Sequence, residues 1–338
     1  MPAKKHIELI DILKGIAILS VILSHAVIVF PINLEAVPWC NTMKNFVGCY
    51  QMPLFFIISG YLCSYHNTQY GAYLLARTKR LLVPYALFSC LAIFFRIVGS
   101  SVVNSKIDLK SAVFELFLQG NASSTYWFLY TLFILSAIAP LLIKLVDKSP
   151  AYGLLLMAVC IVVSTCVQLP YICALGNVVY HGAYYLIGIL LKRVSFQNFC
   201  SKKRLALLAG VSGAIWLLTF FGLQPLSESI YNTVGKYVTA LSGSAFLAAF
   251  FSLVKLPKFI KAPLIFSGKY SLQFYVLNGF LMTAARWLLV TKLGITSPAW
   301  VVLCIFLFCS LCAAPISKIM DSNNLFRFLC GLKVRKKA

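Results

Sequence analysis

Apolar residues fill most of the chain in long blocks, and short segments rich in lysine and arginine separate these blocks. Each block is about 20 residues long, which is the length a helix needs to cross a bilayer. The blocks lack the apolar–polar alternation that marks the strands of a membrane barrel. Because a chain in lipid must satisfy its own backbone hydrogen bonds, the pattern predicts membrane-spanning helices.

We expect about ten spans, joined by connections too short to hold a soluble domain. Residues 1–338 are therefore interpreted as a single integral membrane domain. The first block carries Glu8, Asp11 and Lys14 and has no small-residue cleavage site, which indicates a retained helix and not a signal peptide. The expected spans are 7–30, 46–66, 81–103, 126–146, 151–171, 177–192, 205–223, 236–254, 270–290 and 298–320.

Basic residues give the orientation of these spans. With the amino terminus in the cytosol, 22 of the 30 Lys and Arg residues fall in inside segments, five fall outside and three lie within spans. Cytoplasmic loops retain positive charge, so the fold class is an all-α polytopic membrane protein with both termini cytosolic. The net charge of +22 then faces the anionic lipids of the inner leaflet. The charges are scattered over short loops, so a nucleic-acid partner is not expected.

The composition agrees with this class. The chain is 61% hydrophobic and 11% charged, whereas soluble domains carry roughly a quarter charged residues. Its 12 cysteines mostly lie inside apolar blocks, with no CxxC pair beside a histidine cluster. A metal site is therefore not expected.

The first span carries the most informative polar residues. Lys14 and His25 are eleven residues apart, about three helical turns, so they share one face. Ionisable side chains at membrane depth are costly and usually face a cavity or a partner. His25, near the outer end, could take a proton from a hydroxyl and return it to a leaving group. Spacing alone leaves open the alternative, a Lys14–Asp11 pair that orients the helix and a His25 that only packs.

Three features of the second span could shape a site. Pro53 is expected to bend or break the helix near its start. Ser59 and Gly60 would let a neighbouring backbone approach closely. Tyr61 follows them directly and adds a phenolic hydroxyl.

The cytosolic loop after this span contains Arg77, Lys79 and Arg80. Three cations so close together could clamp a phosphorylated ligand at the inner mouth of the protein. As loop charges they could equally be positive-inside signals without a ligand. The sequence does not decide between these interpretations.

Several polar residues are expected at the outer face. His181 opens the sixth span and could line an acceptor cleft, although packing is the simpler interpretation. A carboxylate there could orient His25, and the sequence does not choose among the candidates. These are Glu35, Asp108, Glu115 and Glu228.

Together these segments resemble the integral membrane acyltransferase-3 family, and in particular its sugar O-acetyltransferases related to fucose 4-O-acetylase. The resemblance implies a ten-helix enzyme that moves an acyl group from cytosolic acyl-CoA to an acceptor at the outer face. Its specific motifs are Asp11-Ile-Leu-Lys14-Gly15…His25, Met52-Pro-Leu-Phe-Phe…Ser59-Gly60-Tyr61 and Arg77…Arg80…Pro84. Weaker similarity follows at Trp127-Phe-Leu, Tyr185-Leu-Ile-Gly188 and Gly268-Lys-Tyr-Ser-Leu…Tyr275.

The resemblance also assigns residues. The family's basic residue and histidine, ten residues between them, map onto Lys14 and His25. Relatives often carry histidine at two positions where this chain has Gln51 and Asn278. An amide can donate and accept hydrogen bonds but cannot shuttle a proton, so acid–base chemistry would fall on His25 alone.

The two lines of reasoning give one mechanistic hypothesis for an acyl-CoA:sugar O-acetyltransferase of a bacterial plasma membrane. Acyl-CoA is the donor, and a cell-surface, exported or lipid-linked glycan is the acceptor. The catalytic candidates are His25 and Lys14, and the acyl-CoA phosphates would bind Arg77, Lys79 and Arg80. The candidates for substrate contact or for binding the developing oxyanion are Gln51, Ser59, Tyr61, Trp127 and Asn278. The alternative function is a glycan transporter, which would more often show paired halves with interrupted helices.

Overall fold

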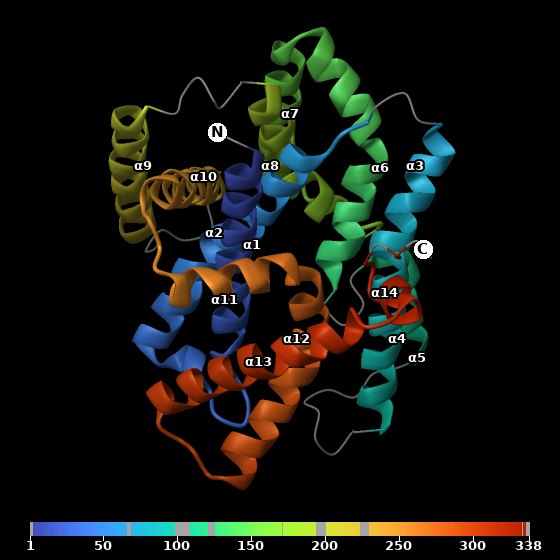
Figure 1. The fold of residues 1–338 in the computed structure, drawn as a ribbon, viewed down its shortest axis with the longest axis vertical. Helices are drawn as coiled ribbons and strands as arrows, with labels where there is room; N and C mark the ends of the chain where they lie inside the picture. Colours follow the sequence, from blue (N-terminus) through green and yellow to red (C-terminus); the bar gives the residue numbers. More distant parts are fainter. Residues whose placement is uncertain are drawn as a thin grey trace.

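The computed structural model describes residues 3–65, 69–98, 109–120, 126–170, 172–193, 201–223, 230–332 and 334–335. Their regular structure is helical throughout (Figure 1), so the predicted all-α membrane fold is confirmed. The count of ten spans, the cytosolic termini and the single domain stay predictions. Within the described residues, six helices are long and apolar enough to cross a membrane: Tyr70–Ile97, Trp127–Lys148, Lys202–Gly222, Thr233–Leu253, Ser271–Lys292 and Pro298–Met320.

A helix lies at each expected span. Several boundaries differ by five residues or more. The helix α7 ends at Cys166 instead of residue 171, and α10 begins at Ile230 instead of residue 236. The helix α1 ends at His25 instead of residue 30, and α2 begins at Pro38 instead of residue 46. Pro53 therefore lies inside a continuous helix and not near its start. Residues 99–103 of the third span lie outside the described part of the chain. The helices are α1 (Ala3–His25), α2 (Pro38–Leu62), α4 (Val83–Val98), α6 (Trp127–Lys148), α7 (Pro150–Cys166), α8 (Leu175–Arg193), α9 (Lys202–Leu223), α10 (Ile230–Leu253), α12 (Ser271–Ala285) and α13 (Pro298–Met320).

Shorter helical segments lie between these helices or after the last one, and most of them were not expected from hydropathy. The exception is η6, which overlaps the expected span 270–290. Another of the short segments, η2, is a π-helical turn whose last amide bond runs from Val83 to the carbonyl of Thr78. Pro84 has no amide hydrogen to offer the preceding turn, which favours such an irregularity. The short segments are η1 (Leu34–Ala36), α3 (Tyr70–Arg77), η2 (Thr78–Leu82), α5 (Leu109–Phe114), η3 (Glu115–Gln119), α11 (Lys258–Lys269), η6 (Arg286–Lys292) and α14 (Asn324–Leu329).

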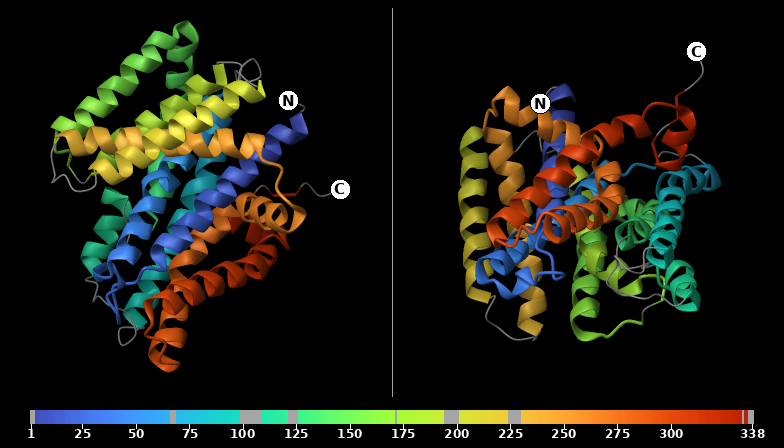
Figure 2. Two further views of the ribbon diagram at one scale, coloured as in Figure 1. Left: turned by 90° about the vertical axis from the view of Figure 1, so that its left-hand side faces the viewer. Right: turned by 90° about the horizontal axis from the view of Figure 1, so that it is seen from below.

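The first helix lies in the centre of the bundle. It packs against α2, α11 and α12 and also contacts α10 and α13 (Figure 2). Its closest neighbour is α11, because Gly15 and Gly268 bring the two backbones together. A Cβ on Gly15 would overlap the carbonyl oxygen of Leu264, and one on Gly268 would overlap that of Asp11. Small residues at a crossing permit this approach.

A second close crossing joins α2 to α8. A Cβ on Gly60 would overlap the carbonyl oxygen of Tyr185, and one on Gly188 would overlap that of Ile57. The predicted close approach at Gly60 is thus confirmed. The first crossing holds α1 against α11, and the second holds α2 against α8. The helices α1 and α2 carry most of the predicted site.

Candidate functional site

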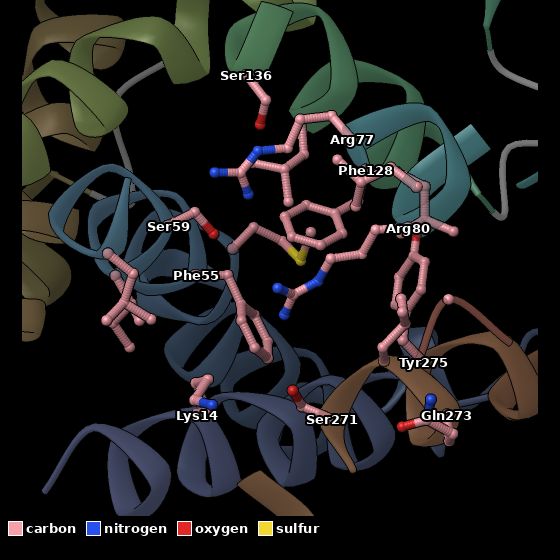
Figure 3. A pocket seen from close by; sticks show the side chains of 18 of the residues that line it. Lys14, Phe55, Ser59, Arg77, Arg80, Phe128, Ser136, Ser271, Gln273 and Tyr275 are labelled. Carbon is pink, nitrogen blue, oxygen red and sulfur yellow. The ribbon is translucent and has the colours of Figure 1, made fainter. Parts of the chain in front are cut away.

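A cavity of about 300 Å³ between α1, α2, α6 and α12 collects four cationic side chains. They are Lys14, Arg77, Arg80 and Lys269, which come from α1, α3, η2 and α11. Figure 3 shows Arg77 and Arg80 reaching into this space while Lys14 approaches from α1. We call it the cationic pocket. Its polar lining also includes Ser59, Ser136, Ser271, Gln273 and Tyr275.

Local contacts hold two of these cations in place. The guanidinium carbon of Arg77 lies 4.9 Å from the ring centroid of Tyr73. That ring is held in turn, because the Tyr73 hydroxyl donates to the carbonyl of Ser136 at 2.9 Å. Lys14 Nζ lies 2.7 Å from Asp11 Oδ1, so the ion pair considered from the sequence is present. Lys14 nevertheless lines the pocket, so the pair does not exclude a role in binding.

The pocket is suited to a ligand with several negative charges. Every charged side chain among its described lining residues is a cation. Arginine binds phosphate through two parallel N–H donors, which lysine cannot do. Mutual repulsion of clustered cations is relieved when an anion enters. Lys79 is exposed and lies outside the lining of this pocket, although the sequence grouped it with its two neighbours.

The carboxyl-terminal segment forms one wall of the cationic pocket, a role that the sequence analysis missed. Gly331 and Leu332 line it, and Gly331 adopts a φ of +66°, which favours glycine. Gln273 anchors this turn by donating from Nε2 to the carbonyl of Cys330 at 3.1 Å. No signal in the sequence joins these residues, because they meet only where the turn after α14 reaches Gln273 of α12.

A second cavity, of about 630 Å³, contains His25 and is called the His25 cavity. His25 is the last residue of α1, and its side chain is exposed to this space. Gln51, Trp127 and Asn278 line the same cavity. Gln51 Oε1 and Asn278 Oδ1 are buried and have no hydrogen-bond partner among the described residues. Such atoms favour a ligand that can satisfy them.

One of the four candidate carboxylates reaches this cavity. Glu35 lines it but is ion-paired with Lys44. Asp108 and Glu228 lie outside the described residues, as does the side chain of Glu115. Glu35 is thus the described acid that shares a cavity with His25.

The two cavities meet at a pair of side chains. Met52 of α2 and Tyr275 of α12 line both of them. Phe128 packs against Tyr275 with ring centroids 5.5 Å apart and lines the cationic pocket. The spacing of Lys14 and His25 predicted that they share one helix face. In the structure they open into different cavities, and the layer of Met52, Tyr275 and Phe128 separates the two.

The fold brings together most of the predicted site residues, but in two groups. Neither group includes Lys79 or Tyr61, and Tyr61 borders a separate apolar pocket near Leu9 and Leu13. The sequence missed Lys269, although the weak Gly268–Tyr275 motif contains it. The cationic pocket holds Lys14, Ser59, Arg77 and Arg80; the His25 cavity holds His25, Gln51, Trp127 and Asn278.

A pocket lined by four cations that adjoins a histidine and two amides is suited to group transfer from a phosphate-bearing donor. A family model described as an acyltransferase domain, Acyl_transf_3, matches residues 7–318. No curated protein and no solved structure matches the chain. The family match contains α1, α2 and α12, which carry most of both cavities. Because it extends over nearly the whole chain, the protein belongs to the Acyl_transf_3 family of membrane acyltransferases.

Proposed function

We propose that the protein is an O-acyltransferase that moves an acetyl group from acetyl-CoA to a hydroxyl of a glycan at the surface of a bacterial plasma membrane. The observation that carries this proposal is the junction of the cationic pocket and the His25 cavity at Met52 and Tyr275. A donor and an acceptor bound on the two sides would meet there. The resemblance to sugar O-acetyltransferases supports the choice of acceptor.

The cationic pocket would hold the donor. The phosphates of acetyl-CoA would lie against Arg77, Arg80 and Lys269, where each phosphate oxygen can accept a charge-assisted hydrogen bond. Ser59 and Lys14 line the path from these cations toward α1 and α2. The thioester end would then extend between Met52 and Tyr275 into the His25 cavity.

His25 would move the proton. Its imidazole takes the proton of the acceptor hydroxyl as the oxygen attacks the thioester carbonyl carbon. The C–S bond breaks, the ester C–O bond remains, and the departing thiolate receives the proton from the imidazolium. Gln51 and Asn278 would bind the oxyanion through their side-chain amide N–H groups. In the structure the unpaired buried atom of each amide is its oxygen, so each amide would have to flip to present its nitrogen there.

Transfer of label from radiolabelled acetyl-CoA to glycan in membranes that contain the protein tests this function. We expect His25→Gln, which keeps a polar side chain but cannot shuttle a proton, to lower the rate by about 100-fold or more. His6→Gln makes the same substitution at the other end of α1 and serves as the matched control. The amount of each variant in the membrane fraction is measured in parallel. Wild-type membranes that move the glycan without labelling it would identify a transporter instead.

A further inference from the structure

A third cavity, of about 490 Å³, opens beside the His25 cavity between α2, α6, α8, α9 and α10. The two spaces share Asn45, Gly48, Met52 and Trp127 as lining residues. The third cavity is thus a side chamber of the space that contains His25. Its volume lies within the roughly 300–1,000 Å³ typical of small-molecule sites.

His181 forms one wall of this chamber and is held rigidly. Its ring packs against two aromatic rings, with centroid distances of 4.5 Å to Phe56 and 5.0 Å to Trp127. The side chain is 7% exposed, and its Nδ1 is buried without a hydrogen-bond partner among the described residues. A buried group of this kind destabilises the folded protein unless a ligand or water completes its hydrogen bonding. Packing explains the ring's orientation but leaves its nitrogen without a partner.

The remaining lining combines aromatic faces with hydrogen-bond acceptors. Tyr180 and Trp127 present aromatic rings. Thr219 and Thr239 donate their hydroxyl hydrogens to the backbone, to the carbonyls of Ile215 and Gly235 at 2.8 Å each. Their oxygens therefore remain available as acceptors.

Aromatic faces beside several hydrogen-bond acceptors match a sugar ring, which has apolar C–H faces and hydroxyl donors at its edge. Lys236 is the charged residue among the described lining. Its cation is compatible with neutral and acidic sugars and disfavours amino sugars with a free ammonium group.

We propose that the His181 chamber binds the sugar ring of the acceptor and thereby presents its hydroxyl to His25. The inference rests on the proposed function and adds the acceptor subsite to it. The shared lining residues Asn45 and Trp127 place the chamber directly beside the cavity that contains His25.

Two substitutions remove hydrogen bonding from the chamber while keeping its shape. His181→Phe keeps an aromatic ring against Phe56 and Trp127, and Thr239→Val replaces a hydroxyl by a methyl group. Thr165→Val is the matched control, because Thr165 also donates to the carbonyl four residues earlier, in α7, and lies outside the chamber lining. The acceptor probes are the methyl glycosides of fucose, galactose, glucose and N-acetylglucosamine.

Two rates are measured on purified protein: acetyl transfer at varied glycoside concentration, and acetyl-CoA hydrolysis without acceptor. We expect the chamber variants to raise the KM for the accepted glycoside by about tenfold, the effect of one lost hydrogen bond. Their KM for acetyl-CoA and their hydrolysis rate should stay near those of wild type and of Thr165→Val. If His181→Phe also loses hydrolysis through general damage, Thr239→Val decides.

The outcomes separate the two proposals. An unchanged glycoside KM in both chamber variants would overturn the chamber as acceptor site and leave the enzyme's function standing. Transfer to glycerol but to no glycoside would overturn the sugar as its occupant. If the wild-type protein shows neither acetyl transfer nor acetyl-CoA hydrolysis that depends on His25, the proposed function is wrong. The proposed role of the chamber then falls with it.

Discussion

Met52 of α2 and Tyr275 of α12 line both the cationic pocket and the His25 cavity. A donor that reaches from one cavity to the other must pass between these two side chains. The flexible Met52 side chain can change rotamer to admit a small acyl group, whereas the Tyr275 ring is packed against Phe128. The pair is therefore placed to limit the size of the acyl group.

Met52→Ala should widen this passage. We expect the ratio of the hexanoyl-CoA rate to the acetyl-CoA rate to rise by about tenfold, because a few methylene groups gain room that the methionine occupied. Rates with acetyl-, butyryl- and hexanoyl-CoA measure the effect. Met157→Ala in α7, away from both cavities, is the control. Equal chain-length profiles for wild type and Met52→Ala would show that acyl length is set elsewhere.

Arg80→Gln should weaken binding of the donor. We expect the KM for acetyl-CoA to rise by about tenfold, since a charge-assisted phosphate contact contributes roughly 1.5–3 kcal/mol. Acetyl-pantetheine, which has no phosphate on its pantetheine arm, should be used equally well by wild type and variant. Lys79→Gln changes a side chain of the same π-helical turn that lies outside the pocket lining, and its effect should be smaller. A larger effect at Lys79 would contradict this placement of the donor.

Asn278→Leu should separate activity from stability. The substitution removes a buried oxygen that has no partner among the described residues, so thermal stability should be equal or higher. If the amide binds the oxyanion, kcat should fall by about 100-fold. Melting temperature and kcat are measured on the same preparation. A stable variant with full kcat would assign Asn278 no part in transfer.

Gly60→Ala should destabilise the protein. Its Cβ would overlap the carbonyl oxygen of Tyr185 and force α2 away from α8, a clash that costs about 1–3 kcal/mol. Gly210→Ala in α9 is the matched control, because a Cβ added there would meet nothing within 4 Å. The control should be neutral or slightly stabilising, since alanine favours the helix. Thermal unfolding in detergent measures the melting temperatures of wild type, Gly60→Ala and Gly210→Ala. Equal melting temperatures for the two variants would refute the close crossing of α2 and α8.

Much of the candidate site was readable before the fold was known. The specific motifs around Lys14, His25 and Met52 indicated the acyltransferase family, which the family match shows, and they made His25 the principal catalytic candidate. The sequence singles out Asn278 only because relatives often carry histidine at that position. Its position in the His25 cavity, with that of Gln51, depends on how α2 and α12 each pack against α1.

Some predicted residues were grouped wrongly in space because sequence proximity is a weak guide to a shared cavity. Arg77, Lys79 and Arg80 are near neighbours, yet a helical turn distributes them around the axis and Lys79 falls outside the pocket lining. Tyr61 follows Ser59 by two residues, and it points to a different pocket. Lys269 joined the cationic pocket from a helix that hydropathy did not predict.

The sequence by itself determined where the long helices lie, because bilayer thickness fixes the length of an apolar block and each helix satisfies its own backbone hydrogen bonds. Only the tertiary structure decided that Lys14 and His25 serve separate cavities, that Met52 and Tyr275 stand between them, and that His181 borders a side chamber. A cavity is the space left by helices distant in sequence. Its shape depends on close crossings such as Gly60 with Gly188, which no local pattern of residues specifies.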